Sequence, residues 1–188
     1  GWAFYHANTI QAQQECFLRG LIVPMEKLDD DRTFSPLLWT LSVMLSIEKR
    51  IGDTKINFIE FVACVQTTTP SNDVEKVVDA ILKIRGERKA AENKKKFDRE
   101  LIEKAVERYC KQKDNFKGYA DMNIRYLISS GIVKRAGRGL SLAPEYHSMA
   151  KELIKDVVST ESLKERYKKL CQGAPLPTDN EETANRVL

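Results

Sequence analysis

Residues 131–142 read Gly131-Ile132-Val133-Lys134-Arg135-Ala136-Gly137-Arg138-Gly139-Leu140-Ser141-Leu142. Two short apolar pieces, each with the composition of a strand, flank a turn that holds two glycines, which is typical of a β-hairpin. Three basic side chains, Lys134, Arg135 and Arg138, place positive charge on this narrow element. The stretch therefore predicts a basic hairpin that can reach toward a negatively charged surface.

A helix is expected immediately before the hairpin, between Gly118 and Gly131. Its buried side follows the helical repeat and consists of Ala120, Ile124, Leu127 and Ile128. The polar residues Asp121, Arg125 and Ser129 recur every four positions and therefore share a different face. The pattern predicts a helix with an exposed polar face beside the hairpin.

The remaining elements are expected to be helices as well. Their start signals are Thr9, Ser35 with Pro36, Asn72 with Glu75 three residues on, Phe97, Pro144, and Ser162 with Glu165. The apolar stretch 56–65 indicates a core segment, and the polar stretch 85–96 indicates a solvated helix or linker. We therefore expect a mainly α fold of two winged-helix-like modules, residues 1–92 and 93–188, with one short β-hairpin.

Composition narrows the class of protein without identifying a partner. The 188 residues are 42% hydrophobic, which is enough to form real cores, and the net charge of +4 is only a mild basic excess. No run of about 20 uncharged apolar residues occurs, so no membrane partner is expected. The four cysteines lie far apart with no zinc-ligand spacing, which predicts reduced thiols and a cytoplasmic location.

A helix followed by a basic hairpin is typical of the later part of a winged-helix domain, where the helix enters the DNA major groove and the hairpin contacts the backbone. On the expected helix, the planar fork of Arg125 can read guanine, and Asp121, Asn123 and Ser129 can address other base edges or phosphates. The alternative is a solvated surface hairpin, with Arg125 paired to Asp121 one turn earlier.

A second, weaker candidate lies at the helix that begins near Asn72. Asn72 and Lys76 follow a loop of three threonines, residues 67–69, and hydroxyls leading into a helix N-terminus suit phosphate binding. An ordinary helix cap is the alternative interpretation.

No catalytic constellation is evident. Only Asp53-Thr54-Lys55 and Glu92-Asn93-Lys94 approach the carboxylate-to-lysine spacing of metal-dependent nucleases, and neither belongs to an expected strand. The two histidines lack a neighbouring nucleophile or ligand spacing, and no nucleotide-binding glycine motif is present. We therefore expect no catalytic residue, metal ligand or cofactor within these residues.

Several short stretches carry a family resemblance through their shared order. They are Phe34-Ser35-Pro36-Leu37, Phe61-Val62-Ala63-Cys64 with Asp73-Val74-Glu75, Ala80-Ile81 through Arg85-Gly86-Glu87-Arg88, Ala120-Asp121 through Arg125-Tyr126-Leu127 to Ser130-Gly131-Ile132, and Pro175-Leu176-Pro177. In this order they resemble the AlwI-type family of type IIS restriction and nicking endonucleases, which recognise a short asymmetric site and cut outside it.

The resemblance implies a helical, winged-helix-like region that recognises double-stranded DNA, and a separate nuclease domain of the PD-(D/E)XK type that cuts with magnesium. We expect that nuclease domain or subunit to lie beyond residue 188, so that these residues alone do not cleave DNA. Two other functions remain open at this point. They are a dimeric winged-helix transcription regulator and a helical protein-interaction module that is indifferent to DNA at low salt.

Overall fold

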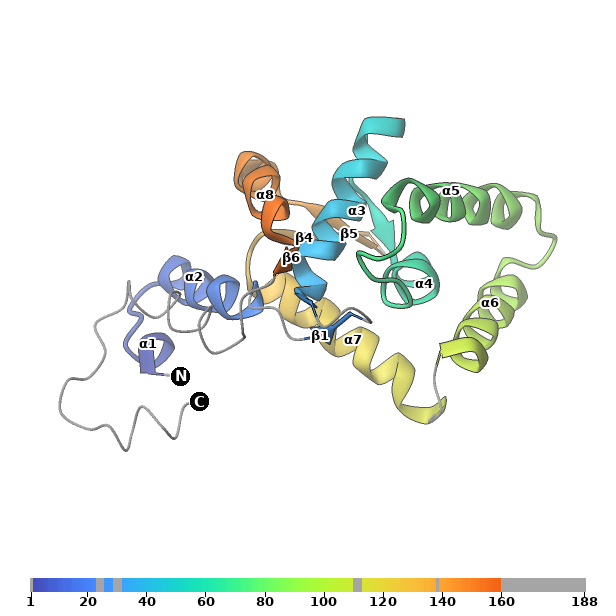
Figure 1. Ribbon diagram of the computed structural model, residues 1–188. Helices are drawn as coiled ribbons and strands as arrows, with labels where there is room; N and C mark the ends of the chain where they lie inside the picture. Colours follow the sequence, from blue (N-terminus) through green and yellow to red (C-terminus); the bar gives the residue numbers. More distant parts are fainter. Residues whose placement is uncertain (1, 23–25, 29–31, 110–112, 138, 160–188) are drawn as a thin grey trace.

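The computed structural model describes residues 2–22, 26–28, 32–109, 113–137 and 139–159 (Figure 1). Its α-helices are α1 Trp2–Tyr5, α2 Ile10–Leu21, α3 Pro36–Ile51, α4 Phe58–Glu60, α5 Val74–Ala90, α6 Lys94–Tyr109, α7 Lys113–Ser129 and α8 His147–Leu153. A π-helix, η1 Phe61–Val65, follows α4, and the 3₁₀ turns η2 Pro144–Tyr146 and η3 Ile154–Asp156 flank α8. The strands are β1 Glu26–Lys27, β2 Thr33–Phe34, β3 Ile56–Asn57, β4 Val133–Ala136, β5 Gly139–Leu142 and β6 Val158–Ser159. The expected mainly α fold is confirmed.

Helix α3 forms the centre of the described structure (Figure 1). It begins where the sequence predicts, because the Ser35 hydroxyl accepts a hydrogen bond from the Leu38 amide and Pro36 occupies the first turn. It ends at Gly52, which adopts a left-handed conformation with φ 73°. Ten of its residues are buried, so the helix is apolar on nearly all sides and α5, η1 and α8 pack around it.

The predicted hairpin is present as β4 and β5, and a third strand that the sequence did not predict pairs with it. The sheet order is β3-β5-β4, fully antiparallel, with Ile56 opposite Leu140 and Asn57 opposite Gly139. This sheet joins residues from both sides of the expected boundary between residues 92 and 93. The division into two modules stays a prediction.

A close backbone contact holds β3 against β5. A Cβ at Gly139 would lie 2.5 Å from the Ile56 carbonyl oxygen, which is a severe overlap with backbone, so only glycine fits. The buried Thr54 hydroxyl accepts a 3.1 Å hydrogen bond from the Leu142 amide and extends the junction by one further contact. The turn of the hairpin uses Gly137 at φ 60°.

A second small sheet joins the segment just before α3 to the last described residues. Its order is β1-β2-β6, with Thr33 opposite Ser159 and Phe34 opposite Val158. None of these two-residue strands was predicted, because such short elements carry no detectable repeat. The helix predicted from Ser162 lies outside the described residues.

Ion pairs explain why the polar stretch 85–96 continues as helix up to Ala90. Glu60 is 1% exposed, and its carboxylate accepts two 2.9 Å hydrogen bonds from Arg85, which also donates to the Lys55 carbonyl. The hydrogen bonds with Glu60 raise the pKa of the Arg85 guanidinium. Arg88 pairs with Asp98 and so joins α5 to α6. Of the two expectations for residues 85–96, a solvated helix or a linker, the structure shows the helix, with a short break between Ala90 and Lys94.

The predicted cap of α5 is wrong by one residue. The Asp73 carboxylate, rather than the Asn72 amide, caps α5 by accepting a 3.0 Å hydrogen bond from the Glu75 amide. The Asn72 side chain instead accepts from the Thr69 amide and closes the preceding turn. Both residue types are good caps, so composition alone does not separate them.

The core contains a thiol whose surroundings oppose its ionisation. Cys64 on η1 is buried, and burial raises the pKa of its thiol to about 12, with the nearby Glu60 carboxylate adding to the rise. Cys64 is a free thiol, as is the partly buried Cys16 on α2. Among the described helices, none combines the length and apolar content needed to cross a membrane.

Gly139→Ala is expected to destabilise the protein by about 1–3 kcal/mol, because the added methyl group overlaps the Ile56 carbonyl and forces β3 away from β5. Urea unfolding followed by circular dichroism measures the loss. Gly86→Ala is the matched control, since Gly86 lies inside α5 with open space around it. The control should gain about 0.5–1 kcal/mol from higher helix propensity. Equal effects of the two variants would contradict the close contact.

Cys64 is expected to resist iodoacetamide in the folded protein at pH 8, because its thiol stays protonated when the pKa is about 12. Mass spectrometry of proteolytic peptides measures alkylation at each cysteine before and after unfolding in urea. Labelling of Cys64 in the native protein at the rate found in the unfolded protein would contradict its burial.

Candidate nucleic-acid interface

The outer face of α7 carries the polar stripe that the sequence predicts. Asp121, Arg125 and Ser129 all lie toward solvent, and the Arg125 side chain is 72% exposed. Arg125 forms an ion pair with Asp121 one helical turn earlier, as the alternative interpretation held. An exposed pair of this kind contributes little to stability, so Arg125 can exchange its carboxylate partner for another acceptor at small cost.

Two of the three predicted hairpin cations lie in the described part of the chain. Lys134 and Arg135 are exposed on β4, whereas Arg138 falls outside the described residues. Within the described ranges, neither Lys134 nor Arg135 forms an ion pair with an acidic side chain. The hairpin therefore presents uncompensated positive charge.

Sequence reasoning missed a further cation at the hairpin turn. Lys55 immediately precedes β3, and its Nζ lies 3.8 Å from the position that a Cβ would take at Gly137. Lys55 is exposed, and its carbonyl is held by Arg85. Because it reaches the turn only through the unpredicted pairing of β3 with β5, no local sequence signal identifies it.

A tight connection fixes the hairpin at the C-terminal end of α7. The buried Ser130 hydroxyl donates a 2.6 Å hydrogen bond to the Leu127 carbonyl, and the Gly131 amide donates to the Ile128 carbonyl. Gly131 has φ 77°, which reverses the chain into β4. The polar stripe of α7 and the basic strand therefore follow each other with almost no intervening chain.

A stripe of exposed apolar side chains on α7 was also missed. Tyr119, Met122 and Tyr126 are 53%, 41% and 42% exposed, although residues of this size and character are usually covered. They recur at the i, i+3 and i+7 positions of one helix and lie beside the polar stripe of Arg125. Their spacing was available in the sequence, but only the opposite, buried side of this helix was assigned to apolar residues.

The weaker candidate, Asn72 and Lys76, lies elsewhere in the fold. Asn72 closes the turn before α5, and Lys76 is exposed in the first turns of that helix. Helix α5 packs on α3, whereas the hairpin packs on α7 and β3. Asn72 and Lys76 thus belong to a different element from the other candidates.

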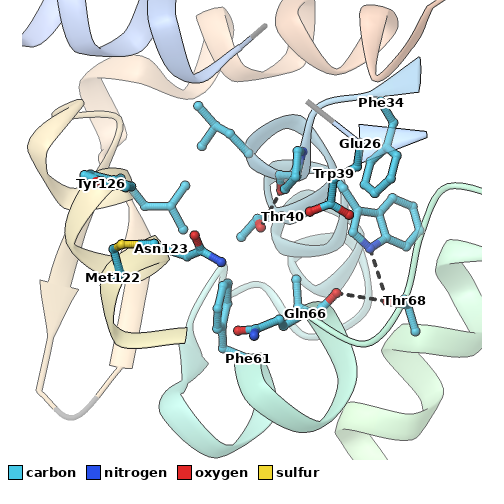
Figure 2. A pocket seen from close by; sticks show the side chains of 14 residues that line it. Glu26, Phe34, Trp39, Thr40, Phe61, Gln66, Thr68, Met122, Asn123 and Tyr126 are labelled. Atoms are coloured by element: carbon cyan, nitrogen blue, oxygen red, sulfur yellow. Dashed lines mark hydrogen bonds between the residues drawn. The ribbon is translucent and has the colours of Figure 1, made fainter. Parts of the chain in front are cut away.

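A pocket of about 260 Å³ lies between α7, the first half of α3 and η1 (Figure 2). Its wall is mostly apolar and aromatic and is formed by Glu26, Phe34, Pro36, Leu37, Trp39, Thr40, Phe61, Val65, Gln66, Thr68, Met122, Asn123, Tyr126 and Leu127. Asn123 is half-buried and lines this pocket, whereas Arg125 lies on the outer face of α7. Two carboxamides therefore face the interior, Asn123 from α7 and Gln66 from the turn after η1.

The polar groups of the pocket wall differ in how well they are satisfied. The Trp39 indole donates a 3.1 Å hydrogen bond to the Thr68 hydroxyl, which itself donates to the Cys64 carbonyl. In contrast, the Gln66 Oε1 atom is buried and has no hydrogen-bond partner among the described residues. Burial also raises the pKa of Glu26, even though part of its surface remains exposed.

Among the described residues, no group of three or more His, Cys, Asp or Glu side chains comes together, so the structure identifies no set of ligands for the magnesium that the resemblance implies. Each of the two carboxylate-to-lysine spacings contains a residue with a local structural contact. The Asp53 carboxylate accepts a hydrogen bond from the Lys55 amide, and the Asn93 side chain accepts one from the Lys96 amide at the start of α6.

Comparison with known protein families matches residues 1–188, the whole chain, to the family described as AlwI restriction endonuclease. No curated protein matches the chain.

Proposed function

Because the chain belongs to the AlwI restriction endonuclease family, we propose that the described residues form the double-stranded DNA recognition region of a type IIS restriction endonuclease. One observation carries the proposal. The exposed polar stripe of α7 leads directly into a hairpin whose Lys134 and Arg135 form no ion pair within the described ranges. A helix next to uncompensated cations suits a groove lined with phosphates.

The order of elements supports a winged-helix plan for this region. Elements α3, β3, η1, α7, β4 and β5 follow one another as helix, strand, helix, helix, strand and strand, with α5 and α6 inserted before α7. In this arrangement α7 enters the major groove, which is about 12 Å wide and admits one α-helix. The hairpin then lies against the adjacent backbone.

The side chains divide into two groups by the chemistry they offer to DNA. The exposed ammonium and guanidinium groups of Lys134, Arg135 and Lys55 contact phosphates, and Arg138, which lies outside the described residues, is assigned the same role from the sequence. Arg125 exchanges Asp121 for the O6 and N7 atoms of guanine.

The remaining candidates have secondary roles in the proposal. Ser129 contacts a base edge or phosphate from the stripe of Arg125, whereas Asn123 acts from the pocket side of α7. Asn72 and Lys76 provide a separate phosphate contact at the start of α5.

We assign cleavage to a separate, magnesium-dependent nuclease domain of the cytoplasmic enzyme. Support comes from the acidic groups near β3, which are committed to structure. The Glu60 carboxylate is buried against Arg85, and Asp53 holds the turn before Lys55. Glu60 is not available as a metal ligand without loss of its contacts with Arg85.

Lys134→Ala combined with Arg135→Ala is expected to weaken binding to all duplexes and to reduce the slope of log affinity against log salt by about 1.8, since each phosphate contact contributes about 0.9. Fluorescence anisotropy between about 50 and 200 mM salt measures the slope. The duplex is first selected from a random-sequence library. Lys94→Ala with Lys95→Ala removes the same charge from α6 and serves as the control. An equal change in both double variants would indicate a general charge effect.

Arg125→Ala is expected to reduce the preference for the selected duplex over a scrambled one by roughly 10- to 100-fold, because a bidentate arginine–guanine contact contributes about 1–3 kcal/mol of discrimination. Competition binding measures this ratio. Arg19→Ala removes an arginine from a similar exposed i, i+4 pair with Glu15 on α2 and should leave the ratio unchanged. An unaltered ratio for Arg125→Ala would remove that residue from base recognition. Absence of binding to any duplex at low salt would favour a protein-interaction module.

A further inference from the structure

We propose that Met122, with Tyr126 beside it on α7, recognises a thymine through the 5-methyl group that this base presents in the DNA major groove. The inference rests on the proposed DNA recognition function and names one element of the sequence that is recognised. It follows from the position of Met122 on the helix, from the exposure of the two side chains and from the chemistry of the groups around them.

Met122 belongs to the outward face of α7. The inward side of the helix holds Ile124 and Leu127, both of which are buried. Met122 lies three positions before Arg125 and seven before Ser129, and this i, i+3, i+7 spacing places the three side chains on one face. When α7 enters the groove with Arg125 toward the bases, Met122 enters with it.

The side chains of Met122 and Tyr126 are open to solvent although they are largely apolar. Met122 is 41% exposed and Tyr126 is 42% exposed, whereas their neighbour Ile124 is 5% exposed. Both line one edge of the pocket between α7 and α3, and the rest of their surface remains accessible (Figure 2). Tyr126 lies one turn after Met122, where a methionine and an aromatic side chain are neighbours on a helix. The pair therefore offers an accessible apolar surface next to Arg125.

The chemistry of the major groove determines what such a surface contacts. The base edges there present hydrogen-bond donors and acceptors, and thymine adds a methyl group. Contact between an apolar side chain and that methyl group distinguishes thymine from the other bases. The flexible thioether side chain of Met122 adapts to the position of the methyl group, and the contact removes apolar surface of both partners from water.

The charged groups around Met122 favour DNA over a protein partner. Aromatic residues, Met and Arg are enriched in protein–protein interfaces, but Asp and Lys are depleted there. Asp121 directly precedes Met122, and the same helix leads into the hairpin that carries the exposed Lys134. An apolar group between such polar and cationic groups matches a groove in which methyl groups lie between two rows of phosphates.

The spacing along α7 limits where the thymine lies. Three residues of an α-helix span about 4.5 Å along its axis. Neighbouring phosphates of one DNA strand are about 3.4 Å apart along the duplex axis, and the base pairs follow the same step. The proposed function assigns Arg125 to a guanine, so the thymine that Met122 contacts lies within two base pairs of that guanine.

Replacement of thymine by uracil removes the methyl group and leaves pairing with adenine unchanged. The experiment uses the full chain and the duplex selected from the random-sequence library, with each thymine of either strand replaced in turn. The guanine contacted by Arg125 is identified as the one whose replacement no longer matters in Arg125→Ala. Fluorescence anisotropy should show a loss of affinity of roughly fourfold at one thymine within two base pairs of it, the size expected for burial of one methyl group.

Met122→Ala tests whether Met122 makes the contact. In this variant the thymine duplex and its uracil counterpart should bind equally, because the side chain that distinguishes them is gone. Met122→Leu keeps an apolar side chain of similar size and should retain most of the difference. Met149→Ala is the matched control, since Met149 is 44% exposed on α8, and it should retain the whole difference. A merely structural role of Met122 would weaken binding of both duplexes and leave the fourfold difference in place.

The outcomes separate the inference from the function on which it rests. A selected site without thymine near that guanine, or specific binding that no uracil substitution weakens, would overturn thymine recognition and leave DNA recognition standing. A fourfold difference that persists in Met122→Ala would overturn the role of Met122. Absence of specific binding to any duplex would overturn both proposals and would favour a protein partner for this face of α7.

Discussion

The approach of two backbones at Gly139 is the constraint on which the rest of the structure depends. The Ile56 carbonyl lies where any side chain at residue 139 would have to be, so β3 and β5 pair only because that residue is glycine. This pairing places the basic hairpin on the apolar core around α3 and brings Lys55 to its turn. Without it, β4 and β5 would be an isolated two-stranded hairpin, which is marginally stable in water.

The buried ion pair between Glu60 and Arg85 also holds β3 in place, through contacts with α5. Arg85 lies on α5, yet it hydrogen bonds the carboxylate after β3 and the carbonyl just before that strand. Removing one partner of such a pair costs about 3–5 kcal/mol, because the other charge is left buried. The inserted helix α5 is therefore part of the support for β3, and α6 follows it before α7 (Figure 1).

Elements marked by local chemistry were predictable, and contacts between distant segments were not. Ser35 with Pro36 identified the start of α3, and the glycines identified the hairpin. Strand β3 was read only as a core segment because it has two residues, too few to show alternation. The exposed polar stripe of α7 was predictable from the spacing of its residues. That Asn123 and Gln66 both line one pocket depends on how α7 packs, which no local pattern contains.

Pairing of β3 with β5 also sets the order in which the chain is able to fold. The hydrogen bond from the Leu142 amide to Thr54 spans 88 positions. At about 5–20 residues per second, a ribosome needs roughly 4 to 18 seconds to extend the chain from Thr54 to Leu142. During synthesis β3 has no strand partner, while the helices between them form within microseconds. Closing so long a loop late favours slow folding, and the exposed strand edge in that interval is open to pairing with other chains.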